Sequence, residues 1–100
     1  GATPIVLSLT IRNIWKDGKL EPTSLHSQWS AETAAATGTA FFDLSTAVAD
    51  QFEKLGAEKT AALYPQDHTH FNAPGADLHA ATVVTGLKTL RGNPFAKFVK

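Results

Sequence analysis

The hydrophobic positions of this chain form two short, nearly continuous apolar runs separated by a long alanine-rich stretch. The first run covers residues 5–11 and is rich in β-branched side chains, and the second covers residues 39–44 and contains two phenylalanines. Continuous rather than alternating hydrophobicity is typical of a strand that is covered on both faces. The sequence therefore predicts two buried strands.

Between the runs, the polar pattern predicts first a turn and then a helix. Asp17-Gly18 is a turn signal for a small surface hairpin. Residues 24–37 are alanine-rich, with Ser24 as the expected N-cap and Gly38 as the left-handed residue that ends the helix. A helix is therefore expected to connect the two strands.

After the second run, the spacing of apolar residues predicts two more helices and a short helical stretch. Ser45 is expected to cap the first helix, Gly56 to end it, and residues 57–64 to add a short helical segment. The last helix has Asn72 as its N-cap, and Gly92 and Pro94 follow it. Its expected buried stripe consists of Ala76, Ala80, Val83, Leu87 and Leu90.

The order strand, helix, strand, helix, helix predicts an α/β fold with a parallel strand pair joined by a right-handed crossover. Two strands buried on both faces need further neighbours, so we expect the pair to belong to a larger sheet. A partner chain or the rest of a longer parent protein would supply the missing strands. At 100 residues, the chain is interpreted as one domain over 1–100 or as part of a larger one, with residues 93–100 as a tail.

Composition and charge exclude several function classes. Nine Lys and Arg balance nine Asp and Glu, so the net charge of zero argues against nucleic-acid binding. The absence of cysteine removes disulfides, thiolate metal sites and cysteine nucleophiles. No apolar run approaches the roughly 18–20 residues that a membrane-spanning helix needs. We expect no membrane partner and no cofactor.

The densest polar cluster lies in residues 64–72, just before the last predicted helix. Asp67 and His70 are close enough for the carboxylate to fix the imidazole tautomer and to stabilise the imidazolium, as in a hydrolytic triad. Two alternatives stay open at this point. Asp67 could simply cap a turn between exposed histidines. Alternatively, His68 and His70 could bind a metal ion together with Asp67.

Residues 67–76, D-H-T-H-F-N-A-P-G-A, resemble the last sequence block of the SGNH, or GDSL-like, hydrolases, and most closely the rhamnogalacturonan acetylesterase branch. Residues 4–12, the Asp17-Gly18 turn and residues 40–45 follow in the order that this family shows. The resemblance extends from about Pro4 to Leu90.

The resemblance implies a flavodoxin-like three-layer α/β/α sandwich with a parallel sheet, whose N-terminal strands are missing from this chain. It implies an ester hydrolase, in this branch a carbohydrate acetylesterase, in which a serine attacks the ester. His70 would act as general base and then acid, and Asp67 would orient it. The expected substrate is an acetylated polysaccharide or another small ester, and the family resemblance suggests a secreted or periplasmic protein.

The chain lacks the G-D-S and G-x-N-D blocks that carry the nucleophile and the oxyanion hole in this family. None of its serines has the expected sequence context; these are Ser8, Ser24, Ser27, Ser30 and Ser45. We therefore expect the chain to carry only the Asp-His half of a triad. The alternative hypothesis is a catalytically silent assembly module that pairs with a missing N-terminal half or a second copy of the chain.

Other polar and aromatic residues allow two interpretations each. Arg12 follows the first strand, where α/β sheets bind ligands, so it is a candidate substrate-binding residue or the partner of a nearby carboxylate. Trp15 and Trp29 could stack on a sugar or simply pack. His79 is expected to be structural or exposed, and His26 carries no motif.

Overall fold

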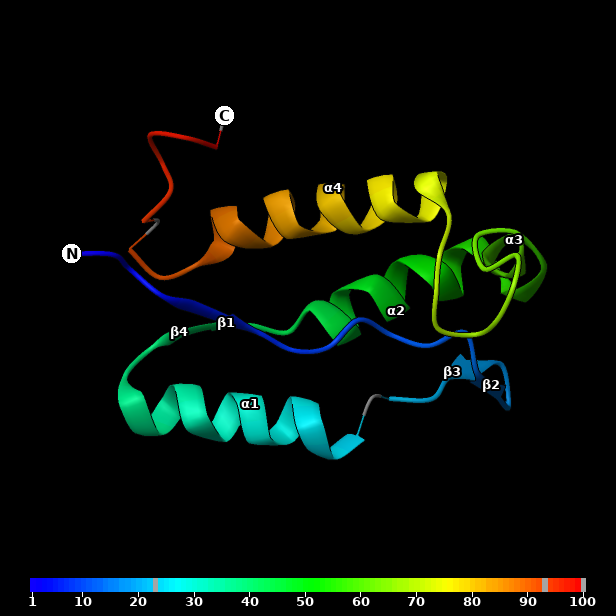
Figure 1. Ribbon diagram of the computed structural model, residues 1–100, viewed down its shortest axis with the longest axis horizontal. Coiled ribbons are helices and arrows are strands. Elements are labelled where there is room, and N and C mark those ends of the chain that lie inside the picture. The colour runs from blue at the N-terminus through cyan, green and yellow to red at the C-terminus, as the bar shows by residue number, and fades with distance from the viewer. Residues whose placement is uncertain (23, 93, 100) are drawn as a thin grey trace.

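A computed structural model describes residues 1–22, 24–92 and 94–99. Strand β1 (Ile5–Leu7) pairs in parallel with β4 (Ala40–Phe42), with Ile5 opposite Ala40 and Leu7 opposite Phe42. Helix α1 (Ser24–Thr37) connects them and lies on one side of the pair, whereas α2 (Leu44–Leu55) and α4 (Ala73–Thr89) lie on the other (Figure 1). The mixed α/β class with a parallel pair is confirmed, and it is consistent with part of a flavodoxin-like layered fold.

The expectation of strands buried on both faces is wrong for these residues. Each residue of β1 and β4 is half-buried, and β1 ends at Leu7 rather than near Ile11. Past β1 the chain leaves the sheet, so Leu9 is 51% exposed while Ile11 turns into the core. The reason is that the sheet has two strands, so each of them has an open edge among the described residues.

The turn at Asp17-Gly18 forms as expected. It joins β2 (Trp15–Lys16) to β3 (Lys19–Leu20) in an antiparallel hairpin, with positive φ at both turn residues (52° and 77°). Two successive positive φ values match the right-handed twist of a tight hairpin. Glu53 binds the hairpin to α2. Its carboxylate accepts hydrogen bonds from the Leu20 N–H and the Lys19 ammonium, both at 3.1 Å.

Helix α2 is capped by Asp43 and not by Ser45, so the predicted cap is corrected by two positions. The Asp43 carboxylate accepts from the Thr46 N–H at 3.2 Å, while Ser45 lies buried inside the helix. Gly56 ends the helix with φ 94° and precedes the short helix α3 (Ala57–Ala61). The side chain of Ser24, the other predicted cap, lies outside the described residues, whereas Gly38 adopts the expected positive φ of 65°.

The buried face of α4 agrees with the predicted stripe in part, because Val83, Leu87 and Leu90 are half-buried and Val83 packs against the core. Ala76 and Ala80 are exposed, and the buried residues of this helix are Gly75, His79 and Gly86. Small residues on the inner face let α4 approach closely. A side-chain carbon at Gly86 would overlap the ring of Phe42 on β4. Asn72 caps the helix as expected, accepting from the Gly75 N–H at 3.1 Å.

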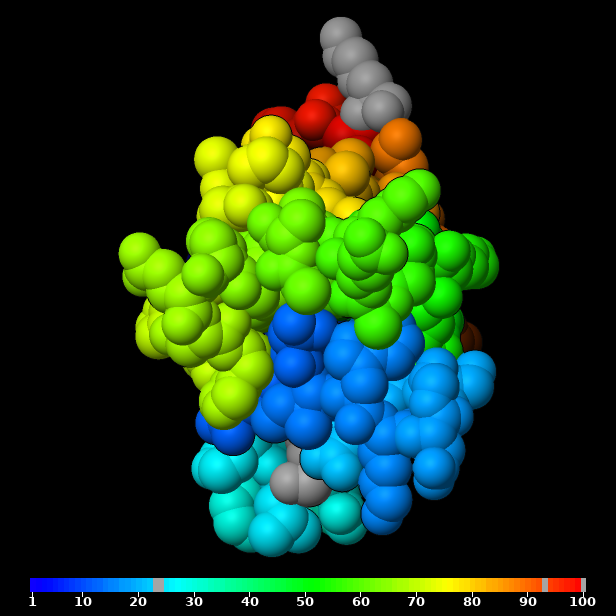
Figure 2. Space-filling view, turned by 90° about the vertical axis from the view of Figure 1, so that its right-hand side faces the viewer, coloured from blue at the N-terminus to red at the C-terminus, as the bar shows by residue number. Residues whose placement is uncertain are grey.

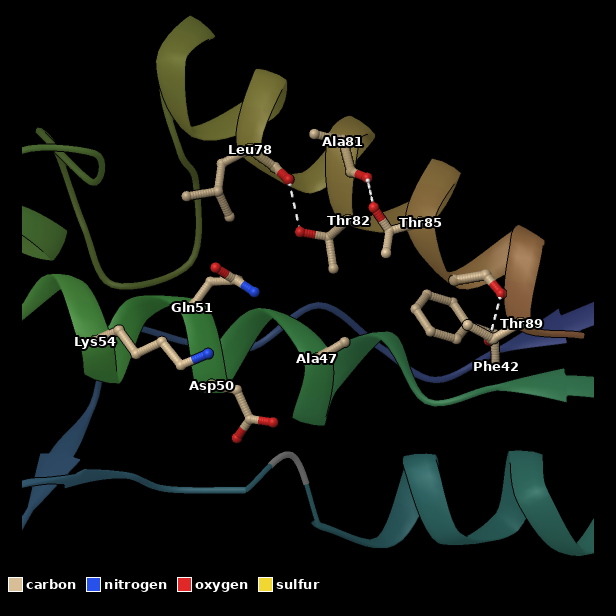
Figure 3. A pocket seen from close by; sticks show the side chains of 11 residues that line it. Phe42, Ala47, Asp50, Gln51, Lys54, Leu78, Ala81, Thr82, Thr85 and Thr89 are labelled. Carbon is tan, nitrogen blue, oxygen red and sulfur yellow. Dashed lines mark hydrogen bonds between the residues drawn. The ribbon is translucent and has the colours of Figure 1, made fainter. Parts of the chain in front are cut away.

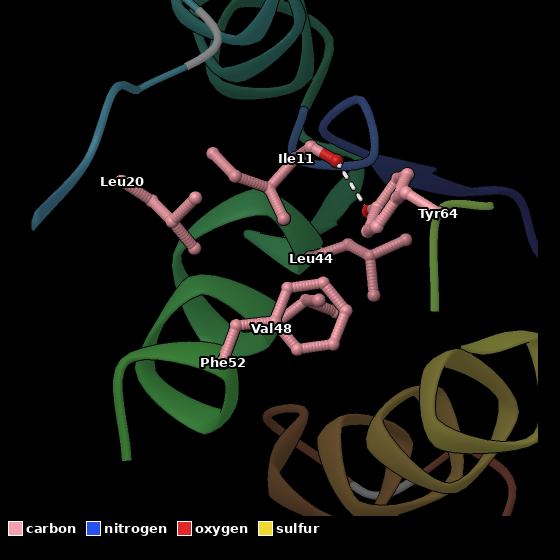
Figure 4. Close-up of a cluster of buried hydrophobic side chains, with 6 residues drawn as sticks. All are labelled: Ile11, Leu20, Leu44, Val48, Phe52 and Tyr64. Atoms are coloured by element: carbon pink, nitrogen blue, oxygen red, sulfur yellow. Dashed lines mark hydrogen bonds between the residues drawn. The ribbon is translucent and has the colours of Figure 1, made fainter. Parts of the chain in front are cut away.

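The core lies between α2 and the segments that follow β1 and α3 (Figure 4). Its buried side chains are Ile11, Leu20, Leu44, Val48, Phe52 and Tyr64. Past α4, residues 94–98 form turns, and Phe98 is 79% exposed. Asn93 and Lys100 of the predicted tail lie outside the described residues. None of the helices in the described part is long and apolar enough to cross a membrane.

Candidate active site

The polar loop of residues 65–72 is held against the segment that follows β1. The Asn13 N–H donates to the His68 carbonyl at 2.8 Å, and the Asn72 N–H donates to the Leu63 carbonyl at 2.8 Å. Figure 2 shows the yellow-green loop beside the blue segment after β1. The loop thus lies toward the carboxyl end of a parallel strand, which is where α/β sheets bind ligands.

Within this loop, Asp67 and His70 are joined by a hydrogen bond. The imidazole Nδ1 lies 2.8 Å from the carboxylate Oδ2. The other carboxylate oxygen, Oδ1, accepts from the backbone N–H groups of Thr69 and His70, both at 2.7 Å. The carboxylate therefore forms the turn and also binds the ring, so the turn interpretation and the pairing interpretation describe the same contacts.

These contacts determine the charge of Asp67 and the tautomer of His70. The hydrogen bonds from the His70 N–H, the His70 ring and the Thr69 N–H hold the pKa of Asp67 well below its ordinary value. An ionised carboxylate can only accept, so Nδ1 must carry the ring proton. In neutral His70 the Nε2 lone pair is then available, and the His70 side chain is 79% exposed. This arrangement can take a proton from an incoming hydroxyl.

A groove of about 490 Å³ lies beside the loop. Arg12, His26 and Thr69 line it, together with Leu9, Thr10, Ile14, Glu21 and Pro22. Arg12 is exposed and faces this groove, next to the loop that carries His70. Arg12 therefore shares a groove with Thr69 of the loop, whereas Asp67 and His70 are not among the residues that line it.

The metal interpretation finds no support in the described part of the chain. No group of three or more His, Cys, Asp or Glu side chains converges there in a way that could hold a metal ion. His68 Nδ1 instead lies 2.9 Å from the Thr69 hydroxyl, an exposed local contact. His68 and His70 thus have different partners.

Ser8 is buried and structural. Its hydroxyl donates to the Asp43 carboxylate at 2.7 Å and accepts from the Ser45 N–H at 2.9 Å, so it links the end of β1 to the start of α2. Partial burial of Asp43 opposes its ionisation, but the hydrogen bonds from Thr46 and Ser8 outweigh that effect and lower its pKa. A hydroxyl enclosed in this way is unsuited to attack an external ester.

An aromatic cluster beneath the loop was not predicted from the sequence. Phe71, which follows His70 directly, stacks on His79 with ring centroids 4.0 Å apart and an interplanar angle of 15°. Tyr64 and Phe52 complete the cluster through edge contacts, with Tyr64 against Phe71 and Phe52 against both Tyr64 and His79. The available signal was the four-residue spacing of Gly75 and His79, which places both on one helix face.

The two tryptophans have different environments. Trp15 packs against the core, and its indole N–H donates to the Asn13 side chain at 2.8 Å. Trp29 is 52% exposed and makes an edge contact with His26, a groove residue.

A second groove, of about 430 Å³, lies between α2 and α4 (Figure 3). The hydroxyls of Thr82, Thr85 and Thr89 donate to backbone carbonyls of their own helix. No residue of the 65–72 loop lines this groove. It is therefore separate from the Asp67–His70 pair.

A parallel strand pair between helices, with a carboxylate–imidazole pair in a loop beyond the strands, is the architecture expected of part of an SGNH-type hydrolase. No family model matches the chain. Comparison with curated proteins finds 37% identity over 81 residues to a rhamnogalacturonan acetylesterase from Emericella nidulans, covering 80% of this chain. The chain is therefore similar in sequence to a protein named rhamnogalacturonan acetylesterase. It spans about a third of that relative's length (33%).

Proposed function

We propose that this chain is the C-terminal part of a carbohydrate acetylesterase and that it supplies the acid–base half of the catalytic site. The observation that carries the proposal is the 2.8 Å contact between the Asp67 carboxylate and His70 Nδ1, which leaves Nε2 on the exposed side of the ring. The relationship to a protein named rhamnogalacturonan acetylesterase supports the carbohydrate ester as substrate.

In the proposed reaction, a serine hydroxyl from outside this chain attacks the acetyl carbonyl carbon while His70 Nε2 takes the hydroxyl proton. Asp67 accepts the hydrogen bond from Nδ1–H throughout, without taking the proton, and stabilises the imidazolium that forms. The imidazolium then gives its proton to the sugar oxygen as the carbon–oxygen bond breaks. Water repeats the sequence on the acetyl-enzyme, with His70 again as base.

The proposal assigns the groove beside Thr69 to the substrate. Arg12 is the candidate substrate-binding residue, because it lines this groove together with Thr69 of the loop. The remaining strands of the sheet would come from the rest of the parent protein. The incomplete sheet supports this assignment, because β1 and β4 pair only with each other among the described residues.

The test uses the parent protein that contains this chain, or this chain mixed with the remaining portion, and an aryl acetate as substrate. Replacing His70 with alanine should lower turnover by orders of magnitude. The matched control is His68→Ala, since His68 lies in the same loop and contacts Asn13 only through its backbone carbonyl. Equal loss in both variants, or full activity of His70→Ala, would remove His70 from the mechanism.

A second candidate is an assembly module without catalysis, and the unpaired edges of the β1–β4 sheet are what favour it. Such an edge can pair with a second copy of the chain. A stable dimer of the purified chain, together with no ester hydrolysis by the completed protein, would support this candidate over the esterase.

A further inference from the structure

We propose that His79 is a positioning residue for His70, acting through the ring of Phe71. This inference rests on the proposed function, because it concerns how the acid–base residue is held in place. His79 itself lies in the interior, 6% exposed, and does not face the loop surface.

The position of the His79 ring is fixed from its own helix. Nδ1 lies 2.8 Å from the Gly75 carbonyl, and because a carbonyl can only accept, Nδ1 carries the proton. Nε2 is buried and has no hydrogen-bond partner among the residues that the structure describes. Neutral imidazole fits this site, since a protonated ring would bury a second N–H without an acceptor.

The His79 ring in turn fixes Phe71. The two rings stack with an interplanar angle of 15°, while Tyr64 contacts the Phe71 ring edge to face with centroids 6.0 Å apart. Phe71 is also confined from α4, because a side-chain carbon at Gly75 would lie 2.8 Å from the Phe71 Cβ. Phe71 therefore has little room to move relative to the helix.

His70 directly precedes Phe71, so the backbone that carries the catalytic imidazole is joined to a residue whose ring is held by packing. On the other side, Asp67 accepts from the His70 N–H at 2.7 Å and from its ring at 2.8 Å. The pair is exposed to water, and an exposed local hydrogen bond by itself holds a loop weakly. The buried stack supplies the fixed point from which the exposed pair is oriented.

The experiment compares two variants of the 100-residue chain, His79→Leu and His79→Phe. Leucine fills the site with apolar volume but removes the flat ring, whereas phenylalanine keeps a ring that can stack on Phe71. Hydrogen exchange of the Thr69 and His70 amides reports the turn, and nitrogen NMR of the His70 ring reports the fraction protonated at Nδ1. Neither readout depends on catalysis, so failure of esterase activity would leave this inference testable on its own.

With His79→Leu, we expect both amides to exchange about three- to tenfold faster and the Nδ1-protonated fraction of His70 to fall, as loss of a ring stack implies. With His79→Phe, we expect both readouts to stay at the wild-type level. Val48→Ala serves as a control: Val48 is a fully buried core residue on α2, and its loss should lower global stability without moving either readout.

Three outcomes would overturn the proposal. They are wild-type signals in His79→Leu, equal loss in His79→Leu and His79→Phe, and failure of His79→Phe to fold, since the proposal gives the imidazole no role that a phenyl ring cannot fill. If His79→Leu does not fold, Phe71→Leu removes the same stack from the loop side and must produce the faster exchange.

Discussion

Replacing Tyr64 with phenylalanine removes a single buried oxygen that joins two distant segments of the chain. The phenol O–H donates to the Ile11 carbonyl at 2.9 Å, and both residues are almost fully buried, at 5% and 2% exposure. The phenylalanine ring would keep the edge contacts with Phe52 and Phe71. The variant therefore changes the hydrogen bond and leaves the packing in place.

The expected loss is about 1–2 kcal/mol in the free energy of unfolding. A net hydrogen bond contributes about 0.5–1.5 kcal/mol, and leaving a buried carbonyl without its donor raises the cost toward about 1–3 kcal/mol. In a chain of this size, each kcal/mol lowers the melting temperature by about 4–8 °C. The effect is therefore well within reach of measurement.

Urea unfolding followed by tryptophan fluorescence gives the free energy and its denaturant slope. We expect a lower midpoint with an unchanged slope, because the surface exposed on unfolding stays the same. The control is Ser30→Ala on α1, whose exposed hydroxyl bond to the His26 carbonyl should contribute less than about 0.5 kcal/mol. A loss below about 0.3 kcal/mol for Tyr64→Phe would refute the reasoning, because the phenol would then have no effective role in the buried contact.

Three further predictions concern the same packed region. Burial raises the pKa of Tyr64, the one tyrosine of the chain, from 10.0 to about 12. The contribution of its neutral phenol to the free energy of unfolding is therefore complete below pH 10.0 and is lost as the pH rises toward about 12. Tyrosinate absorbance should therefore rise near pH 10 in urea and later in the native chain, and equal midpoints would contradict this. Burial lowers the pKa of His79 from 6.5, so its contribution to stability is complete above pH 6.5 and is lost as the pH falls below that value. The wild type should therefore lose more stability than His79→Phe between about pH 7.5 and pH 5, as measured by urea unfolding. Gly86→Ala should destabilise by about 1 kcal/mol, since overlap with Phe42 costs about 1–3 kcal/mol and improved helix propensity returns about 1 kcal/mol; a raised urea midpoint would contradict this.

The parts of the fold that depend on local chemistry could be predicted from the sequence. Positive φ at Gly38 and Gly56 and the side-chain cap at Asn72 are properties of single residues and their immediate neighbours. The Asp17-Gly18 hairpin belongs to the same class. These signals give the order of elements and therefore the α/β class.

The predictions are wrong where a contact from a distant segment decides which of several neighbouring residues caps a helix or faces the interior. Asp43 and Ser45 are both good caps by type, and the Ser8 hydroxyl, from 35 residues earlier, bonds the Asp43 carboxylate and the Ser45 N–H. On α4, close approach to Phe42 favours Gly86 on the inner face, which an apolar stripe cannot reveal. Hydrophobicity alone misplaces a helix face when glycine and histidine face the interior.

The candidate site depends both on local sequence and on contacts between distant segments. Asp67 and His70 are three positions apart and meet through a turn that the carboxylate itself forms, so their pairing is encoded locally. The position of the pair on the molecule is not encoded locally. It depends on the hydrogen bond between Asn13 and His68 and on the stack of Phe71 with His79.

The proposed function places the nucleophile outside this chain, so the pair must be ordered by contacts within the chain. A local turn forms the carboxylate–imidazole pair, so the tautomer of His70 does not depend on further strands. In the proposed reaction, delivery of that ring to a hydroxyl from another segment requires a fixed backbone, and we propose that the buried ring stack and Tyr64 supply it. Under the proposed function, the Asp67–His70 pair would be arranged before a nucleophile is brought to it, which would reduce the ordering that assembly of the full site requires.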